Sequence, residues 1–148
     1  MRSMKQSVFT TLLEIQDRTV LENDVAFAFL TNIPITPGHM LIAPKRVVAT
    51  LDELSEAELV GIFALAAQVK ELLRQSFGAE GFNCAWNEGA EYGQSVPHFH
   101  LHIVPRTPGD AGIVSYEPRQ FLYRPGSREP SPEAELAAIA KMLQAHTR

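Results

Sequence analysis

The segment 98–103 alternates between polar and apolar positions. Its polar positions are His98, His100 and His102, and its apolar positions are Phe99, Leu101 and Ile103. Successive side chains of a strand point to opposite faces, so this alternation predicts a strand with one imidazole face and one apolar face. We expect the apolar face to pack on a core and the imidazole face to carry the function.

Three further apolar runs predict short strands. They cover residues 24–30, 39–43 and 82–87, and turn residues rich in proline and glycine separate the first two. Pro44 ends the second run because proline has no backbone N–H to donate to a sheet. The loop 88–96 joins the third run to the histidine segment, and so short a loop favours an antiparallel pair.

Two segments have the periodicity of amphipathic helices. The first begins at a capping box between Ser55 and Glu58 and ends at Gly78, and the second begins at Ser131-Pro132. Their apolar stripes are Leu59, Ile62, Ala66, Val69 and Leu73 in the first helix and Ala134, Leu136, Ile139 and Leu143 in the second. A long helix that covers a sheet of about five antiparallel strands is an α+β fold.

The chain is long enough for one substantial core. It has 148 residues, of which 45% are hydrophobic, and this length is typical of one domain. We therefore predict a single domain over 1–148, with its core at about 8–106, an irregular segment at about 107–130 and a C-terminal helix at about 131–145. Loops over a rigid site usually set specificity, so we expect the irregular segment to influence the choice of substrate.

Charge and cysteine content exclude several classes of protein. The formal net charge is −4 without a long basic run, which argues against binding of a nucleic acid polymer but leaves a small phosphate ligand open. Cys84 is the single cysteine, so intramolecular disulfides and cysteine-rich zinc clusters are excluded and a reducing compartment is expected. Its alternation with Phe82 and Trp86 predicts a small hydrophobe on the apolar face. No apolar stretch has the length of a membrane span, and we predict a cytoplasmic protein without a membrane partner.

Several short motifs occur in the order and spacing of a known family. They are Pro37-Gly38-His39, Pro44-Lys45-Arg46, Phe82-Asn83, Asn87-Glu88-Gly89, Gly93-Gln94-Ser95-Val96 and the alternating histidines. Over about residues 8–106 they closely resemble the histidine triad family of nucleotide hydrolases and transferases. The combination is more specific than alternating histidines alone, because the preceding Gly-Gln-Ser-Val fits a phosphate site.

The resemblance implies that His100 is a nucleophile. A histidine titrates near neutrality, so its neutral form can attack phosphorus and form a phosphoramidate that water later cleaves. In this scheme His100 becomes nucleotidylated, His98 and His39 orient its ring, and His102 contacts the phosphate or the leaving group. The implied substrate is a small molecule: a nucleoside polyphosphate, a dinucleoside polyphosphate or a nucleoside phosphoramidate.

The resemblance also implies a binding site for phosphate and ribose. Ser95 and Gln94 offer a hydroxyl and backbone amides to the anion. Asn87 offers a neutral donor near the α-phosphate, although asparagine also supports turns. Family members usually place Asp or Asn eight residues before the Pro-Gly-His histidine to hold the ribose hydroxyls. Here Thr31 occupies that position and Asn32 follows it, so one hydroxyl replaces a carboxylate that accepts two hydrogen bonds.

A metal site is the main alternative for the alternating histidines. With His39 as a fourth nitrogen ligand they match the ligands of zinc or copper, but no carboxylate is near and the Gly-Gln-Ser-Val sequence is then unexplained. Many bacterial family members also carry a structural zinc site, formed by a Cys-x-x-Cys pair, a histidine after Pro-Lys-Arg and the first triad histidine. The corresponding positions here are Ser7, Thr10 and Val47. We therefore expect no cofactor and no metal.

Two alternatives concern partners and the class of function. Family members form homodimers whose sheets join edge to edge, and the exposed edge of so small a sheet favours a homodimer here. Lys45 and Arg46 either attract polyphosphate or lie solvated after a strand. A non-catalytic nucleotide-binding or scaffolding protein is the alternative class, although the chain keeps all three alternating histidines.

Overall fold

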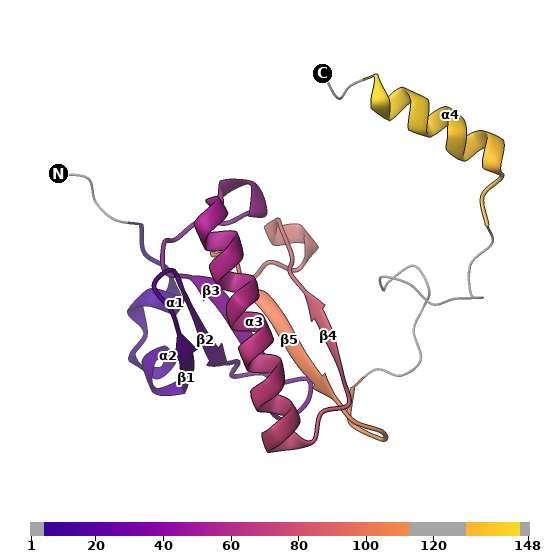
Figure 1. Cartoon of the computed structure of the whole chain (residues 1–148). Helices are drawn as coiled ribbons and strands as arrows, with labels where there is room; N and C mark the ends of the chain where they lie inside the picture. Colours follow the sequence, from indigo (N-terminus) through magenta and orange to yellow (C-terminus); the bar gives the residue numbers. More distant parts are fainter. Residues whose placement is uncertain (1–4, 113–129, 146–148) are drawn as a thin grey trace. The chain divides into compact units, whose positions relative to one another are not determined.

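The computed structural model describes residues 5–112 and 130–145. The chain divides into two compact units, Met1–Gly112 and Ile113–Arg148, and each is described by itself (Figure 1). Residues 113–129 of the predicted irregular segment lie outside the described residues. The single domain over 1–148 and the influence of this segment on specificity therefore stay predictions.

The first unit is built on a five-stranded antiparallel sheet with the strand order β1-β2-β3-β5-β4. The strands are β1 Thr19–Glu22, β2 Ala26–Leu30, β3 Met40–Pro44, β4 Gly81–Ala85 and β5 Leu101–Arg106. One long helix, α3 (Glu56–Phe77), lies across this sheet (Figure 1), which confirms the predicted α+β fold. β4 and β5 are antiparallel neighbours, as the short loop between them predicts.

Hydrophobic periodicity does not reveal the N-terminal elements. β1 has only four residues, too few for a clear sequence pattern, and its pairing with β2 is irregular between Thr19 and Leu21. The elements that lead into it are also too short for a repeating pattern. The short helical elements absent from the prediction are α1 Val8–Thr11, α2 Leu13–Arg18, η1 Leu51–Glu53 and η2 Ala90–Tyr92.

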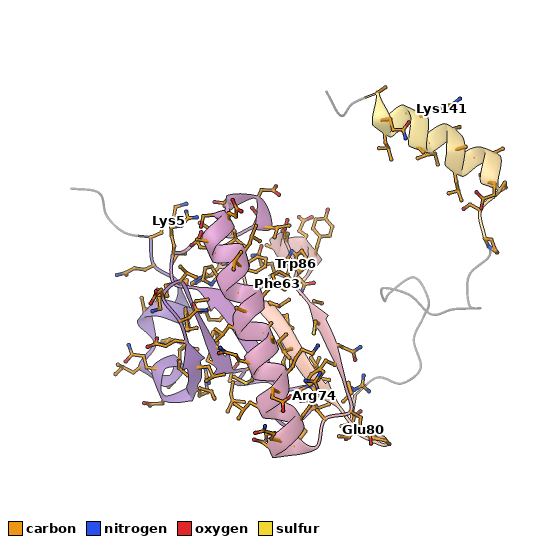
Figure 2. The ribbon with its side chains drawn as sticks, viewed as in Figure 1. Lys5, Phe63, Arg74, Glu80, Trp86 and Lys141 are labelled. Atoms are coloured by element: carbon orange, nitrogen blue, oxygen red, sulfur yellow. The ribbon has the colours of Figure 1, made fainter. Side chains whose placement is uncertain are left out.

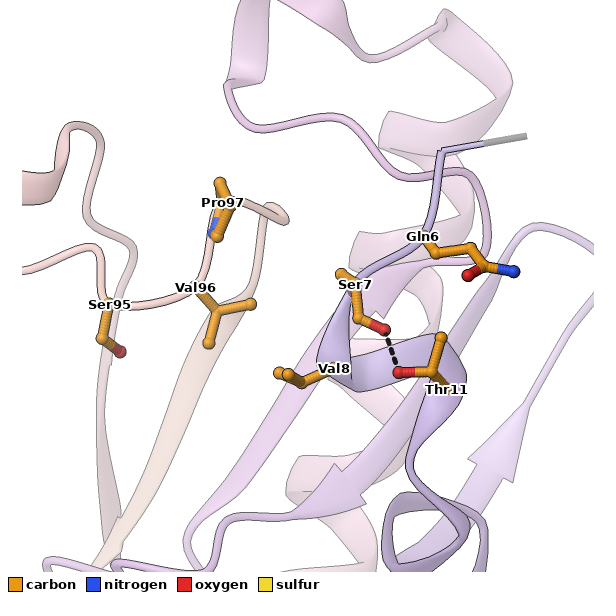
Figure 3. Close-up of a pocket in the computed structure, with 7 residues that line it drawn as sticks. All are labelled: Gln6, Ser7, Val8, Thr11, Ser95, Val96 and Pro97. Carbon is orange, nitrogen blue, oxygen red and sulfur yellow. Dashed lines mark hydrogen bonds between the residues drawn. The ribbon is translucent and has the colours of Figure 1, made fainter. Parts of the chain in front are cut away.

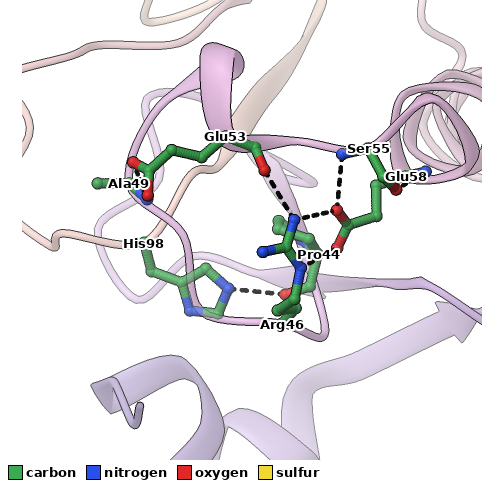
Figure 4. Close-up of polar contacts among 7 residues, drawn as sticks. All are labelled: Pro44, Arg46, Ala49, Glu53, Ser55, Glu58 and His98. Atoms are coloured by element: carbon green, nitrogen blue, oxygen red, sulfur yellow. Dashed lines mark hydrogen bonds and ion pairs between the residues drawn. The ribbon is translucent and has the colours of Figure 1, made fainter.

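The long helix α3 spans Glu56–Phe77, as its periodicity predicts. The Ser55 hydroxyl accepts from the Glu58 amide at 3.1 Å, and the Glu58 carboxylate accepts from the Ser55 amide at 2.9 Å, which completes the capping box. Gly78 ends the helix in the left-handed conformation with φ 66°. Arg46 donates to Glu58 at 2.6 Å and 3.2 Å (Figure 4), so its guanidinium is engaged at the start of α3.

Two apolar clusters pack on opposite faces of the sheet. The larger cluster joins the stripe of α3 to Phe99, Leu101 and Ile103. Alternate residues of β2 and β3 belong to different clusters, as expected of strands that are buried on both faces. The predicted apolar face of the histidine segment is therefore confirmed. The smaller cluster, on the side of α1 and α2, contains Phe9, Ile15, Phe27, Phe29, Leu41 and Ala43.

The histidine segment is only partly a strand. β5 begins at Leu101, after His98 and His100, so the prediction of a strand through the whole segment is wrong at its start. Pairing with β3 stops at Ile42 and Leu101, and the Phe99 amide donates to the Val48 carbonyl at 2.6 Å. Side chains still alternate before the strand, since Phe99 packs in the larger cluster.

β4 is an edge strand and ends at Ala85, two residues earlier than predicted. Cys84 pairs with Ile103, so it lies on the apolar face, as its alternation predicts. It is nevertheless exposed on this strand at the end of the sheet. Cys84 therefore lies on the predicted face, but the expectation that it packs there as a small hydrophobe is wrong, because the residue is exposed.

In the second unit, α4 spans Glu133–Gln144 and confirms the predicted C-terminal helix. It follows Pro132 without a side-chain cap, and its side chains are exposed. No helix within residues 5–112 and 130–145 is both long and apolar enough to cross a membrane.

Candidate active site

Four of the chain's five histidines gather on the face of the sheet opposite α3. His98 and His100 pack against Phe9 of the smaller cluster, with ring centroids 5.4 Å and 5.1 Å apart. His102 follows on β5, and His39 lies just before β3 with its ring centroid 5.2 Å from that of His102. The structure thus brings together the four histidines that the sequence singles out.

Hydrogen bonds occupy both ring nitrogens of His98. Its Nε2–H donates to the Pro44 carbonyl at 2.7 Å (Figure 4), and its Nδ1 lies 2.6 Å from the Ser7 hydroxyl oxygen. Since a carbonyl only accepts, Nε2 carries the proton and Nδ1 is the acceptor of the neutral ring. The side chain is 0% exposed, and this burial lowers the pKa of His98, so the ring is neutral at pH 7.

His100 has one nitrogen engaged and one available. Its Nδ1–H donates to the His98 carbonyl at 2.7 Å, which leaves a lone pair on Nε2. No other described residue hydrogen-bonds to Nε2, and burial lowers the pKa of His100. The ring is therefore a neutral imidazole at pH 7, held from behind by the backbone, with a nucleophilic nitrogen in front.

His39 and His102 form a second hydrogen-bonded pair. The Ile35 amide donates to His39 Nδ1 at 3.1 Å, so the proton of neutral His39 is on Nε2 and is donated to His102 Nδ1 at 3.0 Å. His102 therefore carries its own proton on Nε2, where it can donate to a ligand. Burial and then the neighbouring His100 and His39 lower the pKa of His102 to about 4, and burial lowers the pKa of His39.

Gln94 holds the loop before the histidines. Its side chain is 6% exposed; Oε1 accepts from the Gly89 amide at 2.9 Å, and Nε2 donates to the Ala49 carbonyl at 2.8 Å. The Asn87 amide donates to the Gly93 carbonyl at 3.5 Å and is exposed. The Gln94 amide is therefore engaged within the protein, whereas the Asn87 side chain stays at the surface.

Ser95 lies in a pocket between the loop and the N-terminal segment. Figure 3 shows the loop and the start of α1 facing each other across this pocket. None of the four histidines lines this pocket, and Ser95 makes no hydrogen bond with a histidine in the described part of the chain. The residues that line the pocket are Gln6, Ser7, Val8, Thr11, Ser95, Val96 and Pro97.

Thr31 and Asn32 lie in the connection from β2 to His39. The Thr31 amide donates to the His39 carbonyl at 3.2 Å, and its hydroxyl accepts from the Ile33 amide at 3.3 Å. Asn32 is exposed. The backbone of Thr31 is therefore fixed beside His39, but neither side chain makes a hydrogen bond with a histidine ring in the part of the chain described.

The zinc site of many bacterial family members does not fit these residues. Ser7, Thr10 and Val47 replace its cysteines and one histidine, and both nitrogens of His98 are engaged in hydrogen bonds. Within 5–112 and 130–145, no group of three or more His, Cys, Asp or Glu side chains is arranged to hold a metal ion.

Several partners of the triad carry no signal in the sequence motifs. Ser7 attracts notice only as a replaced cysteine, yet its hydroxyl contacts His98. Phe9 packs on two of the histidines and belongs to no motif, and the Ile35 amide and the Pro44 carbonyl act through the backbone. Backbone partners leave no signal in the identity of a residue.

Comparisons with known proteins agree on one family. The model of the HIT domain matches residues 13–109. The bis(5'-nucleosyl)-tetraphosphatase of Schizosaccharomyces pombe is 31% identical over 72% of this chain and 59% of its own length. The bis(5'-adenosyl)-triphosphatase of Dictyostelium discoideum is 28% identical over 88% of this chain and 85% of its own length.

A solved structure from Streptococcus mutans superposes with a TM-score of 0.79 at 25% identity and covers 99% of this chain and 88% of that one. The chain spans less than two thirds of the S. pombe relative. The matched domain itself covers well over half of the chain and includes the four gathered histidines. The protein therefore belongs to the histidine triad (HIT) family.

Proposed function

We propose that this HIT protein hydrolyses nucleotides, with dinucleoside polyphosphates as the first class of substrate to test. Two relatives are named as hydrolases of such compounds, a bis(5'-nucleosyl)-tetraphosphatase and a bis(5'-adenosyl)-triphosphatase. Nucleoside polyphosphates and nucleoside phosphoramidates have the same reacting group, a phosphorus atom with a displaceable oxygen or nitrogen. They are the further candidates.

The observation that carries the proposal is the state of His100. Its Nδ1–H is bound to the His98 carbonyl, so the lone pair is on Nε2. In the first step Nε2 forms a bond to the α-phosphorus, and the bond from phosphorus to the leaving group breaks. In the second step water attacks the same phosphorus, the P–N bond breaks, and a nucleoside monophosphate leaves. The ring of His100 is regenerated as neutral imidazole.

The neighbouring groups supply the charge stabilisation. His102 holds its proton on Nε2 because His39 donates to its Nδ1, so it can donate to a phosphate oxygen or to the leaving group. Ser95 and Asn87 add neutral donors to the phosphate, and Gln94 acts by holding the loop that carries them. A pKa of about 4 for His102 makes hydrogen-bond donation, rather than a permanent positive charge, its contribution.

Thr31 and Asn32 would hold the ribose. The Thr31 amide donates to the His39 carbonyl. The connection that carries Thr31 and Asn32 therefore begins beside the hydrogen-bonded pair of His39 and His102. One threonine hydroxyl accepts fewer hydrogen bonds than a carboxylate, and we expect weak discrimination between ribose and deoxyribose.

The decisive experiment is to trap the covalent intermediate. Diadenosine tetraphosphate is mixed with the protein, the reaction is stopped in denaturant at neutral pH, and peptides are mapped by mass. We expect one nucleoside monophosphate on His100. Label on His98 or His102 would contradict the assignment. Turnover that a chelator abolishes would favour a metalloenzyme, and binding without turnover would favour a scaffolding protein.

We also propose that the protein is a homodimer joined at the β4 edge. β4 ends the sheet and has free backbone groups that an antiparallel copy can pair. Two exposed aromatic side chains lie near this edge: Phe63 of α3 is 55% exposed, and Trp86, which follows β4, is 38% exposed (Figure 2).

Sedimentation at micromolar concentration tests this assembly. We expect a dimer for the unaltered protein and a monomer for Phe63→Asp, because a carboxylate in the apolar contact is left without a partner. Leu13→Asp is the matched control, since Leu13 is 70% exposed on α2, and it should remain dimeric. A monomer before any substitution would overturn the proposal.

A further inference from the structure

Ser7 is a neighbour of the triad that the family match does not contain. The HIT domain model matches residues 13–109, whereas Ser7 precedes α1 and caps it. Its hydroxyl oxygen accepts from the Phe9 amide at 3.1 Å and lies 2.6 Å from His98 Nδ1. Because Nε2 of His98 donates to a carbonyl, Nδ1 has only a lone pair, so the hydroxyl hydrogen of Ser7 is donated to it.

The Ser7 hydroxyl is the first member of a chain of hydrogen bonds that ends at the nucleophile. His98 is fully buried and is held on one side by Ser7 and on the other by the Pro44 carbonyl at 2.7 Å. The backbone carbonyl of the same residue accepts from His100 Nδ1 at 2.7 Å. The orientation of His100 therefore depends on a residue whose own ring is fixed at both nitrogens.

We propose that Ser7 is a positioning residue that selects the tautomer of His98 and, through the His98 backbone, keeps His100 Nε2 aimed at the substrate. The inference rests on the proposed function of His100. Without the hydroxyl, the buried Nδ1 of His98 has no donor, which favours a change of tautomer or a turn of the ring. Either change weakens the bond to Pro44 and loosens the carbonyl that holds His100.

The helix around Ser7 is held by bonds that do not use its hydroxyl. The Ser7 amide donates to the Thr10 hydroxyl at 3.1 Å, and the Thr10 hydroxyl donates to the Ser7 carbonyl at 3.1 Å. Thr11 donates to the same carbonyl at 2.9 Å (Figure 3). The contact with His98 can therefore be removed separately from most of the capping network, and Thr10→Ala is a matched control that perturbs the network alone.

Three substitutions at Ser7 separate the hydrogen bond that its hydroxyl donates to His98 from its role as the N-cap of α1. Ser7→Ala removes the hydroxyl, and Ser7→Thr keeps it. Ser7→Asp keeps an acceptor for the Phe9 amide, since aspartate is a good N-cap, but it has no hydrogen to donate to His98. We expect kcat to fall about three- to tenfold in Ser7→Ala and Ser7→Asp, the worth of one hydrogen bond, with KM nearly unchanged. Ser7→Thr and Thr10→Ala should keep the original kcat.

Imidazole nitrogen chemical shifts give a readout that does not depend on turnover. In the unaltered protein we expect the nitrogen shifts of His98 to show an unprotonated Nδ1, which accepts from Ser7, and a protonated Nε2. In Ser7→Ala and Ser7→Asp the His98 signals should shift, while those in Thr10→Ala should not. Unchanged His98 signals together with unchanged kcat would overturn the inference, and a rise in KM alone would show that Ser7 contacts the ligand instead. If the proposed function of His100 is wrong, the shifts still report whether Ser7 selects the tautomer.

Discussion

On the α3 face of the sheet the buried side chains are hydrocarbon, whereas the opposite face buries imidazole rings to the same degree. Leu101 and Ile103 are 4% and 1% exposed, and His98 and His100 are 0% and 6% exposed. Hydrocarbon needs only volume and close packing. A buried imidazole needs a partner for each nitrogen, because an unpaired polar atom costs free energy when it leaves water.

The histidine face meets this requirement through neighbours far away in the chain. In the part of the chain described, the one buried side-chain nitrogen or oxygen without a hydrogen bond is Arg18 Nε. His100 Nε2 and His102 Nε2 also have no hydrogen-bond partner among the described residues, but neither is one of these buried atoms, so both open toward solvent. One face is therefore built for stability, and the other leaves two ring nitrogens, His100 Nε2 and His102 Nε2, available for chemistry.

The largest expected effect separates activity from stability. His100→Ala should lower kcat on a dinucleoside polyphosphate by ~10⁴-fold, because the covalent route is lost. His146→Ala is the control, since it removes the one histidine to which we assign no role. Thermal unfolding should show that the variant remains folded. Near-normal turnover by His100→Ala would contradict the proposal that the histidine face carries the chemistry.

The reverse experiment is made on the α3 face. Ile103→Ala should lower the free energy of unfolding by about 2–5 kcal/mol, because it leaves a cavity in the larger cluster. The kcat of the folded fraction should change little, since the Ile103 side chain points away from the histidines. Denaturant unfolding and steady-state kinetics on the same sample check both statements. Loss of kcat without loss of stability would show that the two faces are coupled.

Acid should weaken the histidine face more than the α3 face. The pKa of His102 is lowered from 6.5 to about 4 in the folded protein, so the unfolded state binds more protons between these values. The stabilisation from neutral His102 is thus complete above pH 6.5 and is lost as the pH falls toward 4. The pKa values of His39, His98 and His100 are lowered in the same direction.

Urea unfolding at pH 7.5 and at pH 5 measures this difference. His102→Gln should flatten the dependence on pH, because it removes the titrating group with the largest shift. Ile103→Ala should lower stability by a similar amount at both pH values, since its side chain does not titrate. A free energy of unfolding that does not change with pH would contradict the buried, neutral state of these rings.

Much of the fold follows from local patterns in the sequence. The Ser55 and Glu58 capping box, the stripe of α3 and Gly78 predict a helix that the structure places at Glu56–Phe77. These signals act within a few residues of one another, so they survive in any tertiary context. β1 and the start of β5 are not predictable in this way, because β1 has only four residues and β5 begins where it pairs with a segment far away in the chain, Leu101 with Ile42.

The sequence by itself determined the α+β class, the two faces of the histidine segment and the gathering of His39 with the triad through its motifs. Only the tertiary structure decided which nitrogen of each ring carries the proton. Ser7 is 91 residues away from His98 along the chain, Pro44 is 54 away, and His39 is 63 away from His102. Periodicity encodes the direction of a side chain, but a hydrogen bond between distant segments exists only after the whole chain has packed.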